Sequence, residues 1–265
     1  LALSTGGRGI ERLVALKVVR PDARVRKPED LLIHEARLLG LLRHRSIVTV
    51  EDIIDHELGL ALVMEYVPGV DLSEVLRLNQ QEPGVASVGW LAHVGFEVSS
   101  ALRAAWTSPS PLNGKPLRAL HCDVKPSNIR VTPHGQVKLL DFGVSHSELA
   151  EEERMLGTVF YAPPERMETG RATPAGDLFS LGLSLLAVAR GQGMQGRPSG
   201  AEAHRSWAAR TLAPMEAGPY APLVPLLRSL IHEDPQLRPQ HDEARSRFFE
   251  LLRIHGLTPP SERSA

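Results

Sequence analysis

The most constraining feature of the chain is the stretch HCDVKPSNIRVTPHGQVKLLDFG, which covers residues 121–143. It contains two carboxylates, Asp123 and Asp141, separated by 18 positions (141 − 123). Residues 129–131 and 136–140 have the short apolar pattern of β-strands, and the Thr-Pro-His-Gly sequence between them is typical of a turn. A hairpin brings its two ends together, so we expect both aspartates to face one small volume.

Lys125 and Asn128 follow the first aspartate and belong to the same volume. Two carboxylates, an amide and a lysine suit Mg²⁺ and phosphate, because magnesium binds hard oxygen ligands and substrate phosphates. The spacing H-x-D-x-K-P-x-N followed by D-F-G resembles the catalytic and metal loops of protein kinases. Asp-Phe-Gly alone is also a plausible turn, whereas the two motifs at this separation favour a kinase.

Composition limits the alternatives. The chain has 265 residues, a formal net charge of −1 and 42% hydrophobic residues, which allows a sizeable core and gives no bulk attraction to nucleic acid or an anionic membrane. The single cysteine, Cys122, excludes an internal disulfide and fits a reducing cytoplasm. No apolar run reaches the roughly 18 residues of a membrane span. The chain begins with Leu1, so we expect it to be a piece of a longer protein, with a cytoplasmic location for this part.

Lys17 lies within the β-rich run of residues 13–19, and a helix is predicted over residues 29–43, with leucines recurring at three and four positions. An isolated lysine or glutamate in such elements is usually solvated. The kinase resemblance implies instead that Lys17 holds the α- and β-phosphates of ATP and that Glu35 pairs with it.

Residues 47–50 and 60–67 are predicted strands, with a turn near residues 57–59. The sequence Asp-Leu-Ser-Glu from Asp71 predicts a helix start, and this cap explains Asp71 without a ligand. The resemblance implies a gatekeeper, two hinge residues and a ribose contact, in that order: Met64, Glu65 with Val67, and Asp71.

The remainder reads as a helical region with polar loops. The resemblance assigns Thr158 to the end of the activation segment near Asp123. It makes Glu165 and Arg238 a buried pair, and Asp177 a brace for the catalytic-loop backbone. Helices are predicted at residues 87–106, 178–188, 222–231 and 242–254, and loops or tails at 107–116, 191–204 and 257–265.

The resemblance therefore implies an α+β, bilobal protein-kinase-like fold of bacterial style. We expect an incomplete β-rich N-lobe over residues 1–67, a larger helical C-lobe over residues 68–256 and a tail over 257–265. The implied activity is transfer of the ATP γ-phosphate to Ser/Thr hydroxyls of proteins. Asp123, Lys125 and Thr158 are then catalytic, Lys17, Glu35 and the hinge bind ATP, and Asn128 and Asp141 hold Mg²⁺.

Three departures from the family pattern bear on this interpretation. No G-x-G-x-x-G precedes Lys17; the glycines at residues 6–9 fit a turn entering its strand, so we expect the glycine-rich loop to lie upstream and this strand to expose an unpaired edge. Cys122 replaces the arginine that normally meets an activation-loop phosphate. Arg130 stands where the family commonly has an apolar residue under the adenine.

Two other functions stay open at this point. A pseudokinase would keep the fold for docking or regulation, which the absent glycine-rich loop favours and the complete set of charged residues opposes. A small-molecule kinase shares the Asp/Asn/Asp chemistry, but it would not need Glu165, Asp177 and Arg238.

Overall fold

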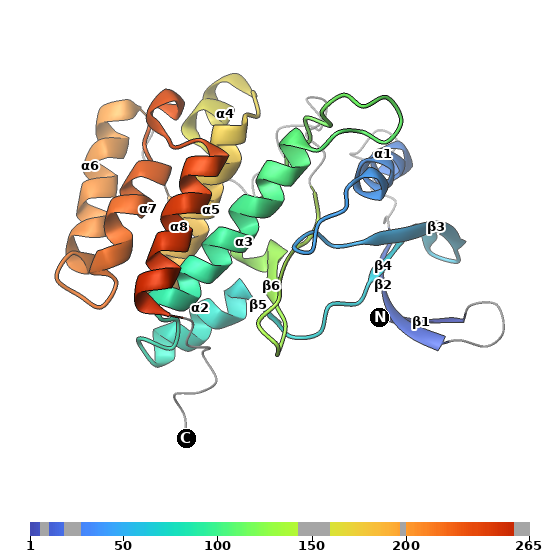
Figure 1. Ribbon diagram of the computed structural model, residues 1–265, viewed down its shortest axis with the longest axis horizontal. Coiled ribbons are helices and arrows are strands. Elements are labelled where there is room, and N and C mark those ends of the chain that lie inside the picture. The colour runs from blue at the N-terminus through green and yellow to red at the C-terminus, as the bar shows by residue number, and fades with distance from the viewer. Residues whose placement is uncertain (6–10, 19–27, 143–159, 197–199, 257–265) are drawn as a thin grey trace.

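The computed structural model describes residues 1–5, 11–18, 28–142, 160–196 and 200–256. A small lobe built on a β-sheet lies beside a larger, mostly helical lobe (Figure 1). The predicted bilobal α+β fold is therefore confirmed. The chain crosses between the lobes after the fourth strand, which ends at Glu65, and we keep residue 67 as the proposed domain boundary.

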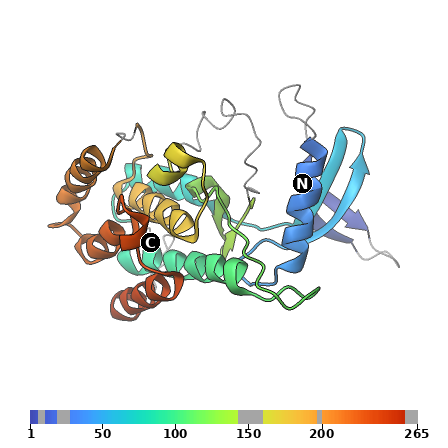
Figure 2. The same cartoon turned by 90° about the horizontal axis from the view of Figure 1, so that it is seen from above.

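The small lobe is an antiparallel sheet with strand order β1-β2-β4-β3 and one helix, α1. Helix α1 packs on β3 and β4 and lies along the sheet in the view of Figure 2. Its buried Leu32, Ala36 and Leu39 explain why the leucine pattern of the sequence marks a helix. The elements are β1 (Ala2–Thr5), β2 (Glu11–Val18), α1 (Pro28–Leu41), β3 (Val50–His56) and β4 (Gly59–Glu65).

Strand β2, which carries Lys17, pairs with two different strands along two parts of its length, and only Val14 is paired on both sides. It pairs with β4 over residues 14–18 and with β1 over residues 11–14. The expectation of an unpaired edge on this strand is therefore wrong for residues 11–14, because Ala2–Thr5 supplies a strand that the sequence pattern did not reveal. The glycines of residues 6–9 fall between β1 and β2 and lie outside the described residues.

The strand predicted at residues 47–50 is displaced in the structure. Ile47 makes only an isolated parallel bridge to Leu139, and β3 starts at Val50. The rest of β3 contains polar residues, including Asp52 and Asp55, which are exposed. An outer strand tolerates such side chains because its pairing with β4 uses backbone groups, so an apolar run is a poor guide to its limits.

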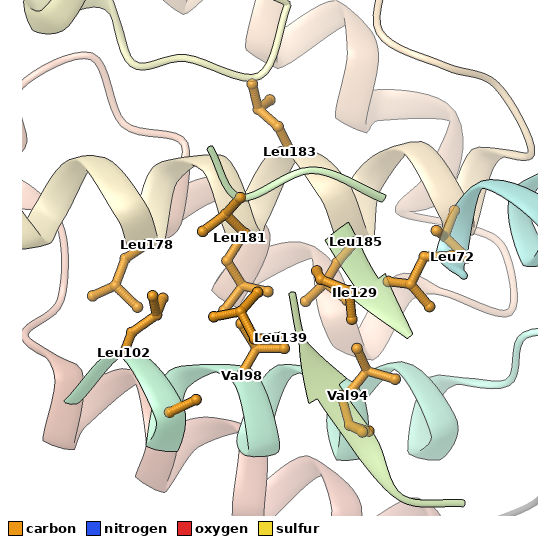
Figure 3. Close-up of a cluster of buried hydrophobic side chains, with 14 of the residues drawn as sticks. Leu72, Val94, Val98, Leu102, Ile129, Leu139, Leu178, Leu181, Leu183 and Leu185 are labelled. Carbon is orange, nitrogen blue, oxygen red and sulfur yellow. The ribbon is translucent and has the colours of Figure 1, made fainter. Parts of the chain in front are cut away.

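The large lobe is organised around the hairpin β6–β7, which lies between α3 and α5. Figure 3 shows Val98 of α3, Leu139 of β7 and Leu181 of α5 meeting in one buried cluster. This packing fixes the two ends of the hairpin. The first polar motif ends immediately before β6, and the second begins shortly after β7. The elements are β5 (Val70–Asp71), α2 (Leu72–Gln81), α3 (Val88–Thr107), the 3-10 helix η2 (Pro126–Asn128), β6 (Ile129–Val131), β7 (Val137–Leu139), α4 (Pro164–Thr169), α5 (Pro174–Arg190), α6 (Ala201–Leu212), α7 (Val224–Leu230) and α8 (His241–His255), with short 3-10 helices at Ala213–Met215, Ala221–Leu223 and Pro235–Leu237.

Helix α6 corrects the prediction of a loop over residues 191–204, since it begins at Ala201. Its His204 is buried, and the ring nitrogen Nε2 lies 2.9 Å from the carbonyl oxygen of Ile231. The helix contacts α7, so tertiary packing stabilises its first residues, which the glycine-rich sequence before them had suggested to be irregular. In the part of the chain that the structure describes, no helix is long and apolar enough to cross a bilayer.

Candidate active site

The backbone before Asp123 is fixed by an aspartate of the central helix. Asp177, in the first turn of α5, accepts hydrogen bonds from the backbone N–H groups of His121 and Cys122, each at 2.8 Å. Burial raises the pKa of Asp177, an effect that the nearby His121 and these two bonds oppose. Cys122 has a φ of 65°, a left-handed conformation that a non-glycine residue rarely adopts. The predicted brace is therefore present, and it holds a strained turn.

His121 connects this turn to the second motif. Its Nδ1 accepts a hydrogen bond from the backbone N–H of Asp123 at 3.2 Å, so Nε2 carries the proton and donates to the carbonyl oxygen of Leu140 at 2.8 Å. Burial lowers the pKa of the ring, which favours this neutral form. The imidazole thus ties the catalytic loop to the residue that precedes Asp141.

The Asp123 carboxylate is held on one side only. Its Oδ2 accepts from Lys125 Nζ at 2.8 Å and from Asn128 Nδ2 at 3.0 Å. Its Oδ1 is buried and has no hydrogen-bond partner among the described residues. A carboxylate positioned through one oxygen keeps the other as an acceptor for a substrate hydroxyl.

Lys17, Glu35 and Asp141 come from three different elements and meet. Lys17 Nζ lies 2.9 Å from both carboxylate oxygens of Glu35 and 3.2 Å from Asp141 Oδ1. Burial acts to lower the pKa of Lys17, but Asp141 and Glu35 raise it above its ordinary value, so the ammonium stays charged. Burial raises the pKa of Glu35, and Lys17 opposes that rise. The strand and helix residues predicted from the sequence are therefore brought together.

The donor set beside Asp123 fits a magnesium ion. Asn128 Nδ2 donates to the backbone oxygen of Asp123 at 2.9 Å as well as to its carboxylate, which leaves the amide oxygen as the group available to a cation. Asp141 adds a carboxylate that is 43% exposed. Among the described residues no group of three or more His, Cys, Asp or Glu forms a metal site by itself. Magnesium commonly takes one or two protein oxygens and completes its shell with phosphates and water.

A cavity of about 250 Å³ opens between the lobes next to these groups. Met64, Glu65 and Val67 line it, whereas Asp71 is not among the lining residues. The Asp71 carboxylate caps α2, since its Oδ1 accepts from the backbone N–H groups of residues 73 and 74 at 2.9 and 3.2 Å. Tyr66, which belongs to the predicted hinge of residues 65–67, also lines the cavity, as do Arg130 and Asp141. Lining residues that the motifs did not single out are Leu1, Ala15, Val48 and Leu140.

The Glu65 side chain is held by two hydrogen bonds. Its side-chain Oε1 accepts from Lys138 Nζ at 2.6 Å and from the backbone N–H of Thr49 at 2.8 Å. Sequence reasoning missed Lys138, because the pair joins positions 73 apart and only the packing of β7 near the end of β4 brings them together.

The predicted pair of Glu165 and Arg238 is confirmed. Arg238 Nη1 and Nη2 lie 2.7 and 2.9 Å from the two oxygens of Glu165, and the arginine side chain is fully buried. The guanidinium also donates to backbone carbonyls, that of His232 at 2.7 Å among them, and lies over the Phe179 ring. This pair anchors α4 to the large lobe.

Arg166 is a second residue that sequence reasoning missed. It follows Glu165 in α4 and donates a hydrogen bond to the backbone carbonyl of Cys122. No motif marks it. Thr158, which was predicted to lie near Asp123, falls outside the described residues.

Comparisons with known proteins agree with this geometry. The family model described as "Protein kinase domain" matches residues 6–249. Similar proteins are the tyrosine-protein kinase MasK of Myxococcus xanthus (31% identity over 191 residues, 70% of this chain and 29% of the relative) and the probable serine/threonine-protein kinase PknB of Lactococcus lactis (29% over 190 residues, 69% and 28%). A third is the serine/threonine-protein kinase PknL of Mycobacterium bovis (33% over 189 residues, 69% and 44%).

The chain thus spans less than half the length of these relatives. The family match covers most of the chain, and both the brace at Asp177 and the pair of Glu165 with Arg238 lie inside it. Nothing in the comparisons favours a pseudokinase. This chain belongs to the protein kinase domain family, with bacterial serine/threonine kinases among its relatives.

Proposed function

We propose that this chain transfers the γ-phosphate of ATP to serine or threonine hydroxyls of protein substrates, with Mg²⁺ as the metal. One observation carries the proposal: Lys17 contacts both Glu35 and Asp141, at 2.9 and 3.2 Å, beside the cavity between the lobes. A lysine held charged between two carboxylates at a cavity mouth suits the phosphates of a nucleotide, which replace part of its carboxylate contacts.

Each residue then has a separate part in the reaction. Asp123 orients the substrate hydroxyl and accepts its proton at Oδ1, while Lys125 moves from Asp123 to the γ-phosphate, whose charge it offsets. Asn128 and Asp141 are the metal ligands, and a bound magnesium ion neutralises phosphate charge. Met64, Glu65 and Val67 contact the base, and Asp71 contacts the ribose if its carboxylate leaves the helix cap. Thr158 completes the catalytic group by supporting Asp123 and Lys125.

The choice of hydroxyl rests on the sequence KPSN after Asp123, which resembles the Ser/Thr branch, and on relatives named as serine/threonine kinases. The relative named as a tyrosine kinase makes this choice worth testing directly. By the same resemblance the protein acts in bacterial signalling in the cytoplasm, without binding nucleic acid.

The test is incubation of the chain with Mg²⁺, radiolabelled ATP and a generic protein substrate, followed by acid hydrolysis and separation of the phosphoamino acids. Phosphoserine or phosphothreonine is expected, and the label should disappear with Asp123→Asn or with EDTA. Phosphotyrosine alone would overturn the Ser/Thr assignment. ATP binding without any transfer would favour the pseudokinase.

A further inference from the structure

Arg130 occupies the centre of strand β6, where its neighbours on both sides are core residues. Ile129 and Val131 are buried, and Ile129 points into the cluster of Figure 3. Because strand side chains alternate, Arg130 faces the other way, and it lines the cavity between the lobes. A half-buried arginine in a largely apolar cavity needs an explanation, since burying a charge costs free energy unless it is used or paired.

The guanidinium of Arg130 is hydrogen-bonded to the connecting segment, which is the stretch of residues 66–69 between the lobes. Its Nε donates to the carbonyl oxygen of Val67 at 2.7 Å, and its Nη2 donates to the carbonyl oxygen of Gly69. Gly69 has a φ of 112° and sits so close to β6 that a Cβ there would lie 2.1 Å from the carbonyl oxygen of Val131. The two acceptors are therefore held firmly against the strand that carries Arg130.

No carboxylate within the described residues forms an ion pair with Arg130. The nearest acidic residue along the sheet is Asp71, its partner in the β5–β6 ladder, and that carboxylate caps α2. The two backbone carbonyls satisfy hydrogen-bond donors but do not neutralise the charge. The part of the cavity wall at Arg130 thus carries a positive charge, while Asp141 contributes a carboxylate elsewhere in the lining.

Hydrogen bonds of a guanidinium lie in its plane, so the two carbonyls hold Arg130 by its edge and leave its faces without such bonds. The small lobe contributes Ala15 of β2 to the lining of the cavity, and Val48 is a further apolar lining residue. A flat aromatic base entering between these residues and Arg130 would meet apolar groups on one face and the guanidinium on the other.

We propose that Arg130 is a base-binding residue that holds a purine by stacking and cation–π attraction. This inference rests on the proposed binding of ATP and deepens it, by naming the group that contacts the base from the large lobe. An arginine over an aromatic ring attracts it electrostatically, most strongly where water is excluded. The two-ring purine offers a larger face than a pyrimidine. The site should therefore prefer ATP to UTP partly because of Arg130.

Equilibrium binding in the presence of Mg²⁺ tests this, with ATP, UTP and inorganic tripolyphosphate as ligands. Arg130→Met keeps the length of the side chain and removes its charge and planar group. It should weaken ATP binding roughly threefold to thirtyfold, weaken UTP binding less, and leave tripolyphosphate binding within about twofold. Arg130→Lys keeps the charge but lacks the planar group, so its affinity for ATP should lie between that of the unmodified chain and that of Arg130→Met. The control is Arg77→Met, since Arg77 is half exposed on α2 and pairs only with Glu74 among the described residues.

Melting temperatures of all variants are measured in parallel, and Arg130→Lys serves if Arg130→Met does not fold. Unchanged ATP affinity in the Arg130 variants would overturn the inference and leave the proposed function standing. An equal loss for ATP and tripolyphosphate would also overturn it, because it would show a general disturbance of the site. Absence of ATP binding in the unmodified chain would remove the proposed function, and the inference with it.

Discussion

The guanidinium of Arg166 donates a hydrogen bond to the backbone carbonyl of Cys122, the residue immediately before Asp123. The backbone N–H of Cys122 donates to the carboxylate of Asp177. Side chains from α4 and α5 therefore hold both the N–H and the carbonyl of Cys122, whose backbone is left-handed. The kinase resemblance places Cys122 where an arginine would meet an activation-loop phosphate. In this chain Arg166 supports the turn through a hydrogen bond to its backbone.

Arg166→Met should lower kcat with little change in the KM for ATP. The hydrogen bond of a charged donor is worth about 1.5–3 kcal/mol, which corresponds to roughly tenfold to a hundredfold in rate if it is needed only for the orientation of Asp123. Arg166→Lys keeps a charged donor and should restore part of the rate. Steady-state kinetics on the two variants check this, and an unchanged kcat in Arg166→Met would contradict the positioning role.

Phosphorylation of the activation segment should not be the main switch. A phosphate on Ser145, Ser147 or Thr158, all outside the described residues, would lack the usual arginine next to Asp123 and would meet the glutamates at residues 151–153. Treatment with a phosphatase should leave the activity of the intact protein within about twofold. A large loss that rephosphorylation at Ser145 or Ser147 restores would show the opposite.

Asp123→Asn and Asp141→Asn should separate chemistry from binding. The first removes the proton acceptor and should lower phosphotransfer by roughly a hundredfold to ten-thousandfold while Mg·ATP affinity stays within a few-fold. The second removes a charged metal ligand and a partner of Lys17, so both transfer and affinity should fall. Kinase assays and nucleotide titrations are run on both variants. Equal losses of ATP affinity would refute the division of roles.

Glu165→Gln should destabilise the fold by about 3 kcal/mol, because it leaves the fully buried Arg238 guanidinium without its counter-charge. A matched control is Glu216→Gln, whose partner Arg228 is half exposed. Exposed pairs contribute about 0–1 kcal/mol, so this control should change little. Urea unfolding gives the free energy of unfolding of both variants. Similar small effects would show that the backbone carbonyls around Arg238 stabilise its buried charge without the Glu165 carboxylate.

Stability should decrease as the pH falls from about 7.5 to about 5.5. Burial lowers the pKa of His121 below its ordinary 6.5, so the unfolded chain takes up the proton first. The stabilising contribution is present above pH 6.5 and is lost as the pH falls from that value through the lower pKa of the folded ring. His44 and His241 are lowered for the same reason and add to the effect. Asp177 and Glu35, whose pKa values burial raises, act in the opposite direction.

Urea titrations across this pH range give the change in the free energy of unfolding with pH. Each histidine contributes at most about 1.4 kcal/mol per pH unit to this slope. His121→Gln cannot take up a proton and should show a shallower slope than the unmodified chain. A stability independent of pH over this range would show that the ring of His121 is charged or accessible in the folded protein.

The sequence alone was enough to predict the α+β fold and the residues that meet around Lys17 and Asp123. The resemblance to protein kinases implied the fold and the pairing of Lys17 with Glu35. Local patterns marked the elements that carry these residues: a hairpin of 3-residue strands joins Asn128 to Asp141, and the leucine period of α1 marks the helix that carries Glu35. Hydrophobic periodicity and turn residues are local signals, and they can be read without knowing which distant residues each element contacts.

Tertiary structure decided the remaining contacts. The hydrogen bond of Arg166 to Cys122 and the attachment of Arg130 to the connecting segment join positions 44 and 63 residues apart, so no local pattern predicts them. Helix α6 and strand β3 also depend on what packs or pairs with them. Long polar side chains find their partners only when distant elements come together, because a hydrogen bond depends on a few ångströms of separation that the order of residues does not specify.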